Sequence, residues 1–375
     1  MQRKTVVHVT SVHPRNDVRI FTKECVTLAR AGYAVTLFVA DGKGNGQCQG
    51  VTIVDVGCFA RGGRLMRMTY TIYRLFQAVR SLGSCLVHFH DPELIIMALW
   101  LKKLGYRVIY DIHEDVPRQL LTKYWIPRWI RPTCSYLWIH LEHYAAKRFD
   151  ALVVPTLHLQ DRFRRIKNPT ILLRNYPLLT ELGKPVAWSK RKNEICYIGS
   201  ISSIRGINIL IEAIHQARVP LQLAGLWSEP MLHEQLVKKA GWCWVHELGV
   251  VNRQGIMNIL MRVKVGVVTL LPTPNHLLAL PIKLFEYMAV GLPVIVSDFP
   301  LWRSIVEQAQ CGLLVDPSDA QAIAQAIRQL LDNPKMAKAM GDAGRQAVLK
   351  QYNWEMESHK LFALYDQLTG SVADS

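Results

Sequence analysis

The chain of 375 residues carries 45 Lys and Arg against 29 Asp and Glu, and half of its residues are hydrophobic. This length is long for one hydrophobic core and suits two domains. No apolar run approaches the ~18 residues that a membrane-spanning helix needs, and the eight cysteines form no C-x-x-C pair, which argues against a zinc ribbon or a disulfide framework.

The first half of the chain alternates predicted strands with predicted helices. Strands are predicted at residues 5–10, 34–40, 51–56, 85–90, 106–112 and 151–154, and helices at 17–32, 65–82, 93–104, 132–148 and 157–166. Asp17 is the expected N-cap of the first helix, which Gly32 ends. The chain opens on a strand rather than on the apolar segment of a signal peptide, so a cytoplasmic protein is expected. Residues 1–175 are predicted to form the N-terminal domain.

The second half restarts the same alternation after a break. Residues 176–193 contain several helix breakers and no hydrophobic period, which predicts a linker. Strands are then predicted at residues 194–198, 221–223, 244–245, 265–270, 294–296 and 313–315 within a C-terminal domain of residues 194–352. A last helix over 353–375 is expected to pack back towards the N-terminal domain. The fold class is therefore α/β, with two Rossmann-like domains whose parallel sheets face a central cleft at the carboxyl ends of their strands.

The stretch VGVVTLLPTPNHLLALPIKLFEYMAVGLPVIVSD, residues 265–298, predicts strand, loop, helix and strand. Pro281 opens the helix, and Lys283 lies in its first turn, where free N–H groups already make a positive end. A cation there is unfavourable unless an anion binds above it. Lys283 and Glu286 together indicate a phosphorylated, hydroxyl-bearing ligand. The alternative is a solvated lysine and a surface glutamate on an ordinary helix.

A second cation stands at a predicted helix start in EICYIGSISSIRGINILIEAI. A strand ends at Gly199, a loop of small residues follows, and a helix begins at Gly206 directly after Arg205. Small residues let the backbone approach a phosphate group closely. Taken alone, an arginine such as Arg205 is more often a solvated loop cation. The pairing with Lys283 favours a phosphate site.

Histidines and carboxylates follow two predicted strands of the first half. His90 and Asp91 come after the strand at 85–90, and His113, Glu114 and Asp115 come after the strand at 106–112. Such groups at strand ends are usual in acid–base or binding roles, although they also cap helices. No third element completes a ligand set around them, so no metal site is expected.

The segment PIKLFEYMAVGLPVIVSD resembles the nucleotide-sugar motif of the retaining family 4 glycosyltransferases of the GT-B fold. The resemblance extends through GSISSIRG, LAGLW and HELGVVNRQ and covers nearly the whole chain. It implies that Glu286 holds the donor ribose, that Arg205 matches a lysine on the diphosphate, and that His113 lies against the donor sugar. It implies a donor site made by Gly199, Ser200, Arg205, Gly206, Gly225, Gly249, Asn275, His276, Lys283, Leu284 and Glu286.

Two positions depart from the family pattern. Leu278 stands where a second glutamate is usual, with Asn275 and His276 nearby, and Ser200 stands where an arginine is usual. A proline-x-lysine-x-x-glutamate variant is similar to bacterial surface-polysaccharide members. We therefore expect an active enzyme with an altered donor site.

The reaction that the resemblance implies is transfer of a hexosyl unit from a nucleotide-diphosphate sugar, with retention and without a cofactor. Arg205 and Lys283 would stabilise the leaving diphosphate, and because no D-x-D motif is present we expect no bound metal. His90, Asp91, Glu114 and Asp115 are assigned to the acceptor side. The alternatives are a nucleotide-sugar epimerase or phosphorylase on the same fold, or a catalytically silent partner subunit.

The net charge of +16 is concentrated in the first half. Residues 1–175 hold 26 Lys and Arg against 12 Asp and Glu, a net of +14, whereas the remaining 200 residues hold 19 against 17, a net of +2. Such asymmetry indicates an anionic partner, and KYWIPRWIR interleaves cations with tryptophans as membrane-interface segments do. The expected membrane contacts are Arg64, Arg67, Trp125, Arg128, Trp129 and Arg131. The alternative is a helix and loop packed on their own domain.

The resemblance to O-antigen and capsule assembly enzymes indicates a lipid-linked glycan acceptor. We therefore expect a protein bound peripherally to the inner face of the cytoplasmic membrane. A nucleic-acid partner is not expected, because the sequence holds no recognisable groove-reading or base-stacking module.

Overall fold

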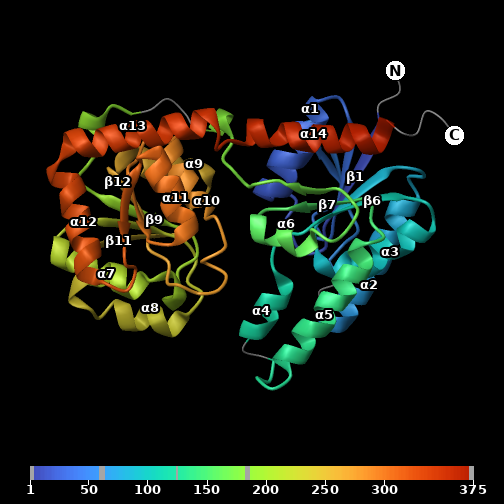
Figure 1. Ribbon diagram of the computed structural model, residues 1–375, viewed down its shortest axis with the longest axis horizontal. Coiled ribbons are helices and arrows are strands. Elements are labelled where there is room, and N and C mark those ends of the chain that lie inside the picture. The colour runs from blue at the N-terminus through green and yellow to red at the C-terminus, as the bar shows by residue number, and fades with distance from the viewer. Residues whose placement is uncertain (1–3, 59–63, 124–125, 182–185, 371–375) are drawn as a thin grey trace. The chain divides into compact units, whose positions relative to one another are not determined.

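The computed structural model describes residues 4–58, 64–123, 126–181 and 186–370, except for the side chains of 64–67 and 122 (Figure 1). The chain divides into two compact units. Unit 1 comprises Met1–Asn175 together with Trp354–Ser375, and unit 2 comprises Tyr176–Asn353. Each unit is built around a sheet of its own.

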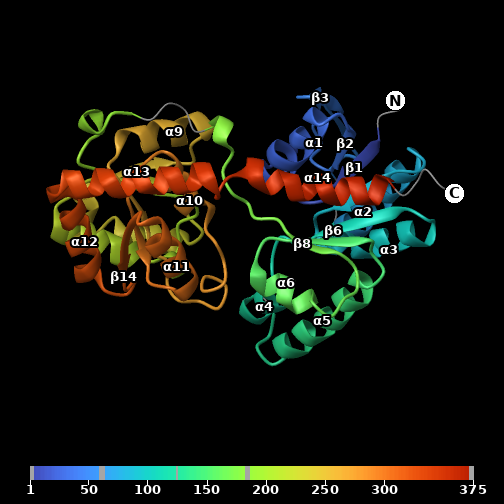
Figure 2. The ribbon, with the colours of Figure 1, turned by 45° about the horizontal axis from the view of Figure 1, so that its top comes forward.

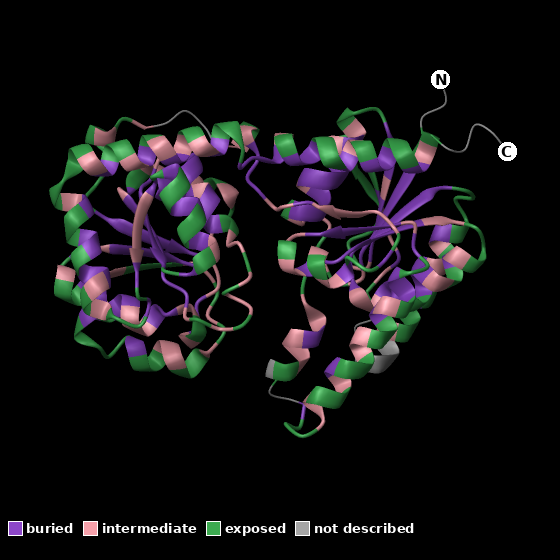
Figure 3. Cartoon of the chain, viewed as in Figure 1, coloured by how far each residue is buried: buried purple, intermediate pink, exposed green. Residues whose placement is uncertain are grey.

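Unit 1 holds an eight-stranded sheet of order β3-β4-β2-β1-β5-β6-β7-β8, in which only β3 runs antiparallel. Its strands are β1 Thr5–Val9, β2 Ala34–Val39, β3 Gly46–Cys48, β4 Val51–Asp55, β5 Leu86–Phe89, β6 Arg107–Asp111, β7 Ala151–Val154 and β8 Thr170–Leu172. The central strands are apolar runs buried on both faces, as strands of a covered parallel sheet must be (Figure 3).

Helices cover both faces of this sheet (Figure 2). They are η1 Val18–Cys25, α1 Val26–Arg30, α2 Arg64–Arg80, η2 Pro92–Leu94, α3 Ile95–Lys103, α4 Val116–Thr122, α5 Arg131–Ala146, α6 Leu157–Phe163 and α14 Trp354–Gly370. The last helix belongs to unit 1, where the Tyr365 hydroxyl lies 3.1 Å from His8 Nε2 and Trp354 Nε1 donates to Thr27 Oγ1 at 2.9 Å.

The helix predicted from Asp17 begins with a π-helical segment, η1, before α1 continues it. Asp17 caps it as expected, accepting hydrogen bonds from the N–H groups of Arg19 and Ile20. The wider turn directs three charged side chains inward, and Arg19, Lys23 and Glu24 are all buried. Single π-helical turns of this kind are frequent at functional sites.

Unit 2 holds six parallel strands in the order β11-β10-β9-β12-β13-β14. They are β9 Ile195–Ile198, β10 Leu221–Ala224, β11 Val245–Gly249, β12 Val265–Val268, β13 Val294–Ser297 and β14 Gly312–Val315. The helices are η3 Leu179–Glu181, η4 Trp188–Lys190, η5 Ser203–Arg205, α7 Ile207–Ala217, α8 Pro230–Leu236, η6 Ala240–Trp244, α9 Arg253–Arg262, α10 Ile282–Ala289, α11 Pro300–Ala309, α12 Ala320–Asp332 and α13 Pro334–Lys350. Two parallel-sheet α/β units confirm the predicted fold class.

The segment predicted as a linker packs on unit 2. The buried Arg191 donates to the carbonyl oxygens of Leu260, Val263 and Val290 at 2.6, 2.9 and 2.8 Å. These bonds anchor the segment because they satisfy carbonyl groups at the ends of α9 and α10. In the structure the second unit begins at Tyr176, so it includes the segment 176–193.

Candidate active site

A buried lysine without a hydrogen-bond partner lies at the start of α10. Lys283 is 8% exposed, and its Nζ donates no hydrogen bond to the described part of the chain. The ring centroid of Tyr197 lies 3.7 Å from Nζ. Burial, followed by repulsion from Arg205, lowers the pKa of Lys283 to about 7. An anion bound here would supply the missing partner and favour the charged form.

The carboxyl ends of β9 and β10 meet at this lysine. Gly199 follows β9 with φ +126°, and a Cβ there would lie 3.1 Å from Lys283 Nζ. Gly225 follows β10 and donates its N–H to the carbonyl of Gly249, at the end of β11, at 2.8 Å. The glycines predicted from the sequence thus lie along one edge of the sheet, and the missing side chain of Gly199 lets Lys283 approach the backbone closely.

Arg205 ends η5 immediately before α7, and its charge contributes to the lowered pKa of Lys283. Gly206, with φ +72°, begins the helix so closely packed that a Cβ would lie 2.2 Å from the carbonyl oxygen of Thr269. Ser200 accepts a hydrogen bond from the Tyr197 hydroxyl on its carbonyl at 2.9 Å, and its own hydroxyl lies 2.9 Å from that of Ser228. The structure therefore brings the two predicted cations together.

The loop before α10 places His276 near both cations. Its Nδ1 lies 2.8 Å from the carbonyl oxygen of Leu271, and burial, together with the charges of Arg205 and Lys283, lowers its pKa. The Asn275 carbonyl accepts from the N–H groups of Leu278 and Ala279, which closes a turn. In contrast, the Leu284 side chain is fully buried in the core of unit 2, so only its backbone is available to a ligand.

Glu286 is held by an arginine that was not predicted from the sequence. Arg253 Nη1 donates to Glu286 Oε1 at 2.5 Å, and its Nη2 pairs with Glu181 at 2.7 Å. Arg253 opens α9, directly after Asn252, which caps that helix. The motif HELGVVNRQ contains this arginine, but nothing in its spacing indicates a partner on α10. A bound ribose would therefore meet a carboxylate already fixed in orientation.

In unit 1, the strand ends bring His90, Asp111 and His113 together. Asp111 Oδ2 lies 2.9 Å from His113 Nε2 and 3.2 Å from His90 Nδ1, and Arg19 forms two bonds to the same carboxylate at 2.9 and 3.1 Å. Burial alone would raise the pKa of Asp111, but Arg19 and His113 outweigh it and hold that pKa well below its ordinary value. Asp111 is thus a carboxylate that orients both imidazoles. The side chain of His113 is 15% exposed and that of His90 is buried.

Two of the residues assigned to the acceptor side are engaged in structural contacts. Asp91 Oδ2 accepts from the Thr10 hydroxyl at 2.7 Å and from the Ser11 N–H at 2.6 Å, and His13 Nε2 lies 3.3 Å from Oδ1. Asp115 caps α4 and forms ion pairs with Arg118, His158 and Arg162. Glu114 is exposed and accepts from Gln119.

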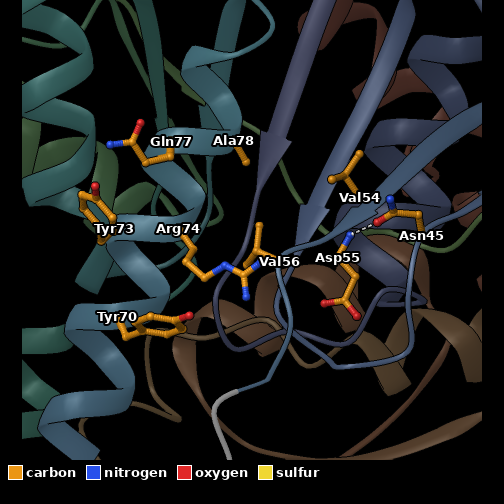
Figure 4. A pocket seen from close by; sticks show the side chains of 9 residues that line it. All are labelled: Asn45, Val54, Asp55, Val56, Tyr70, Tyr73, Arg74, Gln77 and Ala78. Carbon is orange, nitrogen blue, oxygen red and sulfur yellow. Dashed lines mark hydrogen bonds between the residues drawn. The ribbon is translucent and has the colours of Figure 1, made fainter.

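A cavity of about 570 Å³, lined by both apolar and polar side chains, lies at the carboxyl end of β4 (Figure 4). Tyr70, Tyr73 and Arg74 approach it from α2, and Asn45 and Asp55 from the other side, with the Asp55 N–H donating to Asn45 Oδ1 at 2.9 Å. Aromatic faces beside amide, guanidinium and carboxylate groups are features of a small polar-ligand site. This cavity was not predicted from the sequence, because Asn45, the end of β4 and α2 meet there only in the folded unit.

The segment α4–α5 exposes apolar side chains beside cations. Trp129 is 81% exposed, Arg128 is exposed, and Arg131 donates to the carbonyl oxygen of Ile126 at 2.8 Å. The exposed apolar residues of α5 are Tyr136, Leu137, Leu141 and Tyr144. Trp125 lies outside the described residues, as do the side chains of Arg64 and Arg67. No helix in the part of the chain that the structure describes has the length and apolar composition to cross a bilayer.

Family models match both halves of the chain. Residues 19–173 match the glycosyl transferase 4-like domain, and residues 180–347 match the glycosyl transferases group 1. Together the two models match both halves of the chain to glycosyltransferase domains, and its two parallel-sheet units have the fold of known GT-B glycosyltransferases.

Individual relatives are distant in sequence. The MMP α-(1→4)-mannosyltransferase of Mycolicibacterium hassiacum is 22% identical over 297 residues, which are 76% of this chain and 71% of that protein. Sucrose-phosphate synthase of Thermosynechococcus elongatus has a TM-score of 0.78 at 20% identity, covering 98% of this chain and 100% of that one. Anabaena HepE in complex with UDP-glucose has a TM-score of 0.73 at 14% identity, covering 97% and 99%.

Proposed function

We propose that this glycosyltransferase moves a hexosyl unit from a nucleotide-diphosphate sugar to an acceptor hydroxyl with retention of configuration. The observation that carries the proposal is Lys283, a buried cation with no hydrogen-bond partner among the described residues, beside Arg205 and close to the backbone of Gly199. A diphosphate supplies the charge that this site lacks. The binding of UDP-glucose by the structurally similar HepE supports a nucleotide sugar as the donor.

Unit 2 contributes the positive groups that stabilise the leaving nucleoside diphosphate. As the bond to the sugar breaks, negative charge grows on the diphosphate, and Lys283, Arg205 and the N-terminal ends of α7 and α10 stabilise it. Because these groups supply the positive charge, the donor site works without a metal. Glu286, oriented by Arg253, accepts hydrogen bonds from the ribose hydroxyls.

We assign His113 to the reacting sugar on the unit 1 side. Asp111 fixes the His113 ring through Nε2, and Arg19 keeps Asp111 ionised. This arrangement leaves the second nitrogen, Nδ1, for the substrate. The neighbouring His90 is buried, so it supports the arrangement from within the core and does not itself contact the sugar.

We propose that the acceptor is a lipid-linked glycan and that the protein docks on the anionic inner face of the cytoplasmic membrane during surface-polysaccharide synthesis, such as that of O-antigen, lipopolysaccharide or capsule. The α4–α5 segment supports this, because Trp129 and the apolar face of α5 lie beside Arg128. The cavity lined by Tyr73 and Arg74 offers a place for an acceptor sugar.

A calorimetric panel tests the donor site. Nucleoside diphosphates and nucleotide sugars of each base should be titrated into the wild type, into Lys283→Ala and into Lys264→Ala. Lys264 is a matched lysine of unit 2 that contacts Asn193. We expect at least one diphosphate to bind the wild type and the Lys264 variant equally, and to lose about 100-fold or more in affinity in Lys283→Ala. Equal binding by all three proteins would refute this placement of the diphosphate.

A further inference from the structure

A cluster of buried ionisable side chains lies next to Asp111 in the core of unit 1. This histidine cluster consists of His8 on β1, Glu24 on η1, and His88 and His90 on or next to β5, and all four side chains are buried. Apart from His90, none of them belongs to the predicted site. No step of the proposed reaction uses the other three. Burying ionisable side chains costs free energy unless hydrogen bonds or opposite charges compensate them, so their burial needs another explanation.

The four side chains point their nitrogen and oxygen atoms at one another. Glu24 Oε2 lies 3.8 Å from His8 Nδ1, 4.0 Å from His88 Nδ1 and 3.9 Å from His90 Nε2, while His8 Nδ1 and His90 Nε2 are 2.9 Å apart. The three carboxylate distances are too long for hydrogen bonds. Two ligands of one tetrahedral zinc ion, each about 2.0–2.2 Å from the metal, lie roughly 3.3–3.6 Å apart. Small side-chain shifts would therefore let all four residues bind one ion.

Two buried carboxylates beside the histidine cluster face the same guanidinium. The buried carboxylates of Glu24 and Asp111 share the single guanidinium of Arg19, which lies 3.2 Å from Glu24 Oε1 and 2.9 Å from Asp111 Oδ1. Neither oxygen of Glu24 accepts a hydrogen bond from any described residue, and His88 Nε2 also has no partner there. With both carboxylates ionised, one further positive charge is needed to compensate the second, either from a bound metal ion or from a proton on Glu24.

Outer contacts surround the histidine cluster, as they do around the ligands of a metal site. The outer nitrogens of two rings meet partners: Tyr365 Oη lies 3.1 Å from His8 Nε2, and Asp111 Oδ2 lies 3.2 Å from His90 Nδ1. In His88 the Tyr365 hydroxyl instead lies 2.8 Å from Nδ1, the nitrogen that faces Glu24, so this contact must give way when an ion binds. Such second contacts orient histidine ligands in metal sites.

We propose that His8, Glu24, His88 and His90 bind one divalent transition-metal ion, zinc by preference, inside unit 1. Three imidazoles and one carboxylate make a tetrahedral set that suits zinc. The complete burial of the four residues leaves no position open to substrate, so the ion is structural. It would hold β1, η1 and β5 together. Tyr365 connects α14 to this site through His8, and Asp111 connects His113 to it through His90. The inference is independent of the donor site in unit 2.

The test uses untagged protein, because a histidine tag binds metals itself. Wild-type protein is refolded with one equivalent of Zn²⁺ or with a chelator, and its metal content is measured by elemental analysis. We expect one zinc per chain and a melting temperature roughly 5–10 °C higher than with the chelator. Refolding with Co²⁺ should give the visible absorption bands of tetrahedral cobalt.

Two variants sharpen the test. Glu24→Gln should lower the zinc affinity by about 100-fold or more, because it removes an anionic ligand. Glu142→Gln is the matched control: Glu142 is also a buried carboxylate of unit 1, but it is paired with Tyr110 and Arg162. Its metal content should equal that of the wild type.

The competing explanation is that a proton on Glu24 supplies the missing charge, and burial does raise the pKa of Glu24. Glutamine has the shape of a protonated glutamate. Glu24→Gln would then be as stable as the wild type, and the wild type would take up neither zinc nor cobalt; either result overturns the proposal. If Glu24→Gln does not fold, the cobalt spectrum of the wild type still decides the question.

Discussion

The lowered pKa of Lys283 makes donor binding depend on pH. In the free protein, burial and the neighbouring Arg205 lower the pKa of Lys283 to about 7. A bound diphosphate favours the ammonium form and raises that pKa. Binding above pH 7 must therefore be accompanied by uptake of a proton, and the affinity must fall as the pH rises.

The size of the effect follows from linkage. If the pKa of the complex lies above 9, raising the pH from 7 to 8 should weaken binding about 5-fold, and raising it from 7 to 9 about 50-fold. At pH 8 roughly 0.9 proton should be taken up per diphosphate bound. Other groups nearby do not titrate in this window, because burial raises the pKa values of Cys196 and Tyr197 to about 12, and phosphate loses its last proton near pH 6.

The stability of the free protein should show the opposite trend. The folded pKa of Lys283 lies below that of an unfolded lysine, so the unfolded chain binds more protons between pH 7 and about 10.4. This group is therefore destabilising below pH 7, and its penalty disappears as the pH rises through that window. Saturation with diphosphate should remove the trend.

The assay is isothermal titration calorimetry at pH 7, 8 and 9 in pairs of buffers with different ionisation enthalpies, which reports the affinity and the proton uptake together. Lys283→Met should bind more weakly at pH 7, with no proton uptake and little dependence on pH. Lys264→Ala should behave as the wild type. Diphosphate binding by the wild type that varies less than twofold from pH 7 to 9, without proton uptake, would refute the reasoning.

Three further outcomes are expected. Glu286→Gln should weaken nucleoside binding about 10-fold, and Arg253→Ala should also weaken it, since Arg253 only orients Glu286. Calorimetry measures both affinities, and an unchanged affinity in Glu286→Gln would show that the ribose does not bind at Glu286. His113→Ala should lower the turnover number by about 10²-fold or more and leave the donor affinity unchanged, as expected for the loss of an acid–base or positioning group. A normal rate at saturating donor would show that His113 is not in the active site. The protein should sediment with anionic but not with neutral liposomes. The double variant Arg128→Glu with Trp129→Ala should bind the anionic liposomes less, because each cation near such a surface contributes about 1 kcal/mol. Equal binding to both kinds of liposome would contradict electrostatic binding to the membrane.

Local patterns in the sequence were sufficient for the architecture. The alternation of apolar runs with amphipathic segments predicts two parallel sheets, since each run must be buried between covering helices. The cations Lys283 and Arg205 were also found from the sequence, because a positive charge at a helix start conflicts with the dipole of a few adjacent residues. The structure brings the two together beside Gly199.

Only the tertiary structure decided what the buried polar groups do. Asp91 and Asp111 both lie at strand ends, yet Asp91 binds the Thr10 loop whereas Asp111 orients His113. The partners of a carboxylate depend on which strands become neighbours, and the spacing of residues along the chain does not contain that information. The same holds for Glu24 and Tyr365. They contact His8 only once η1 and the last helix pack on the sheet and exclude water from around these side chains.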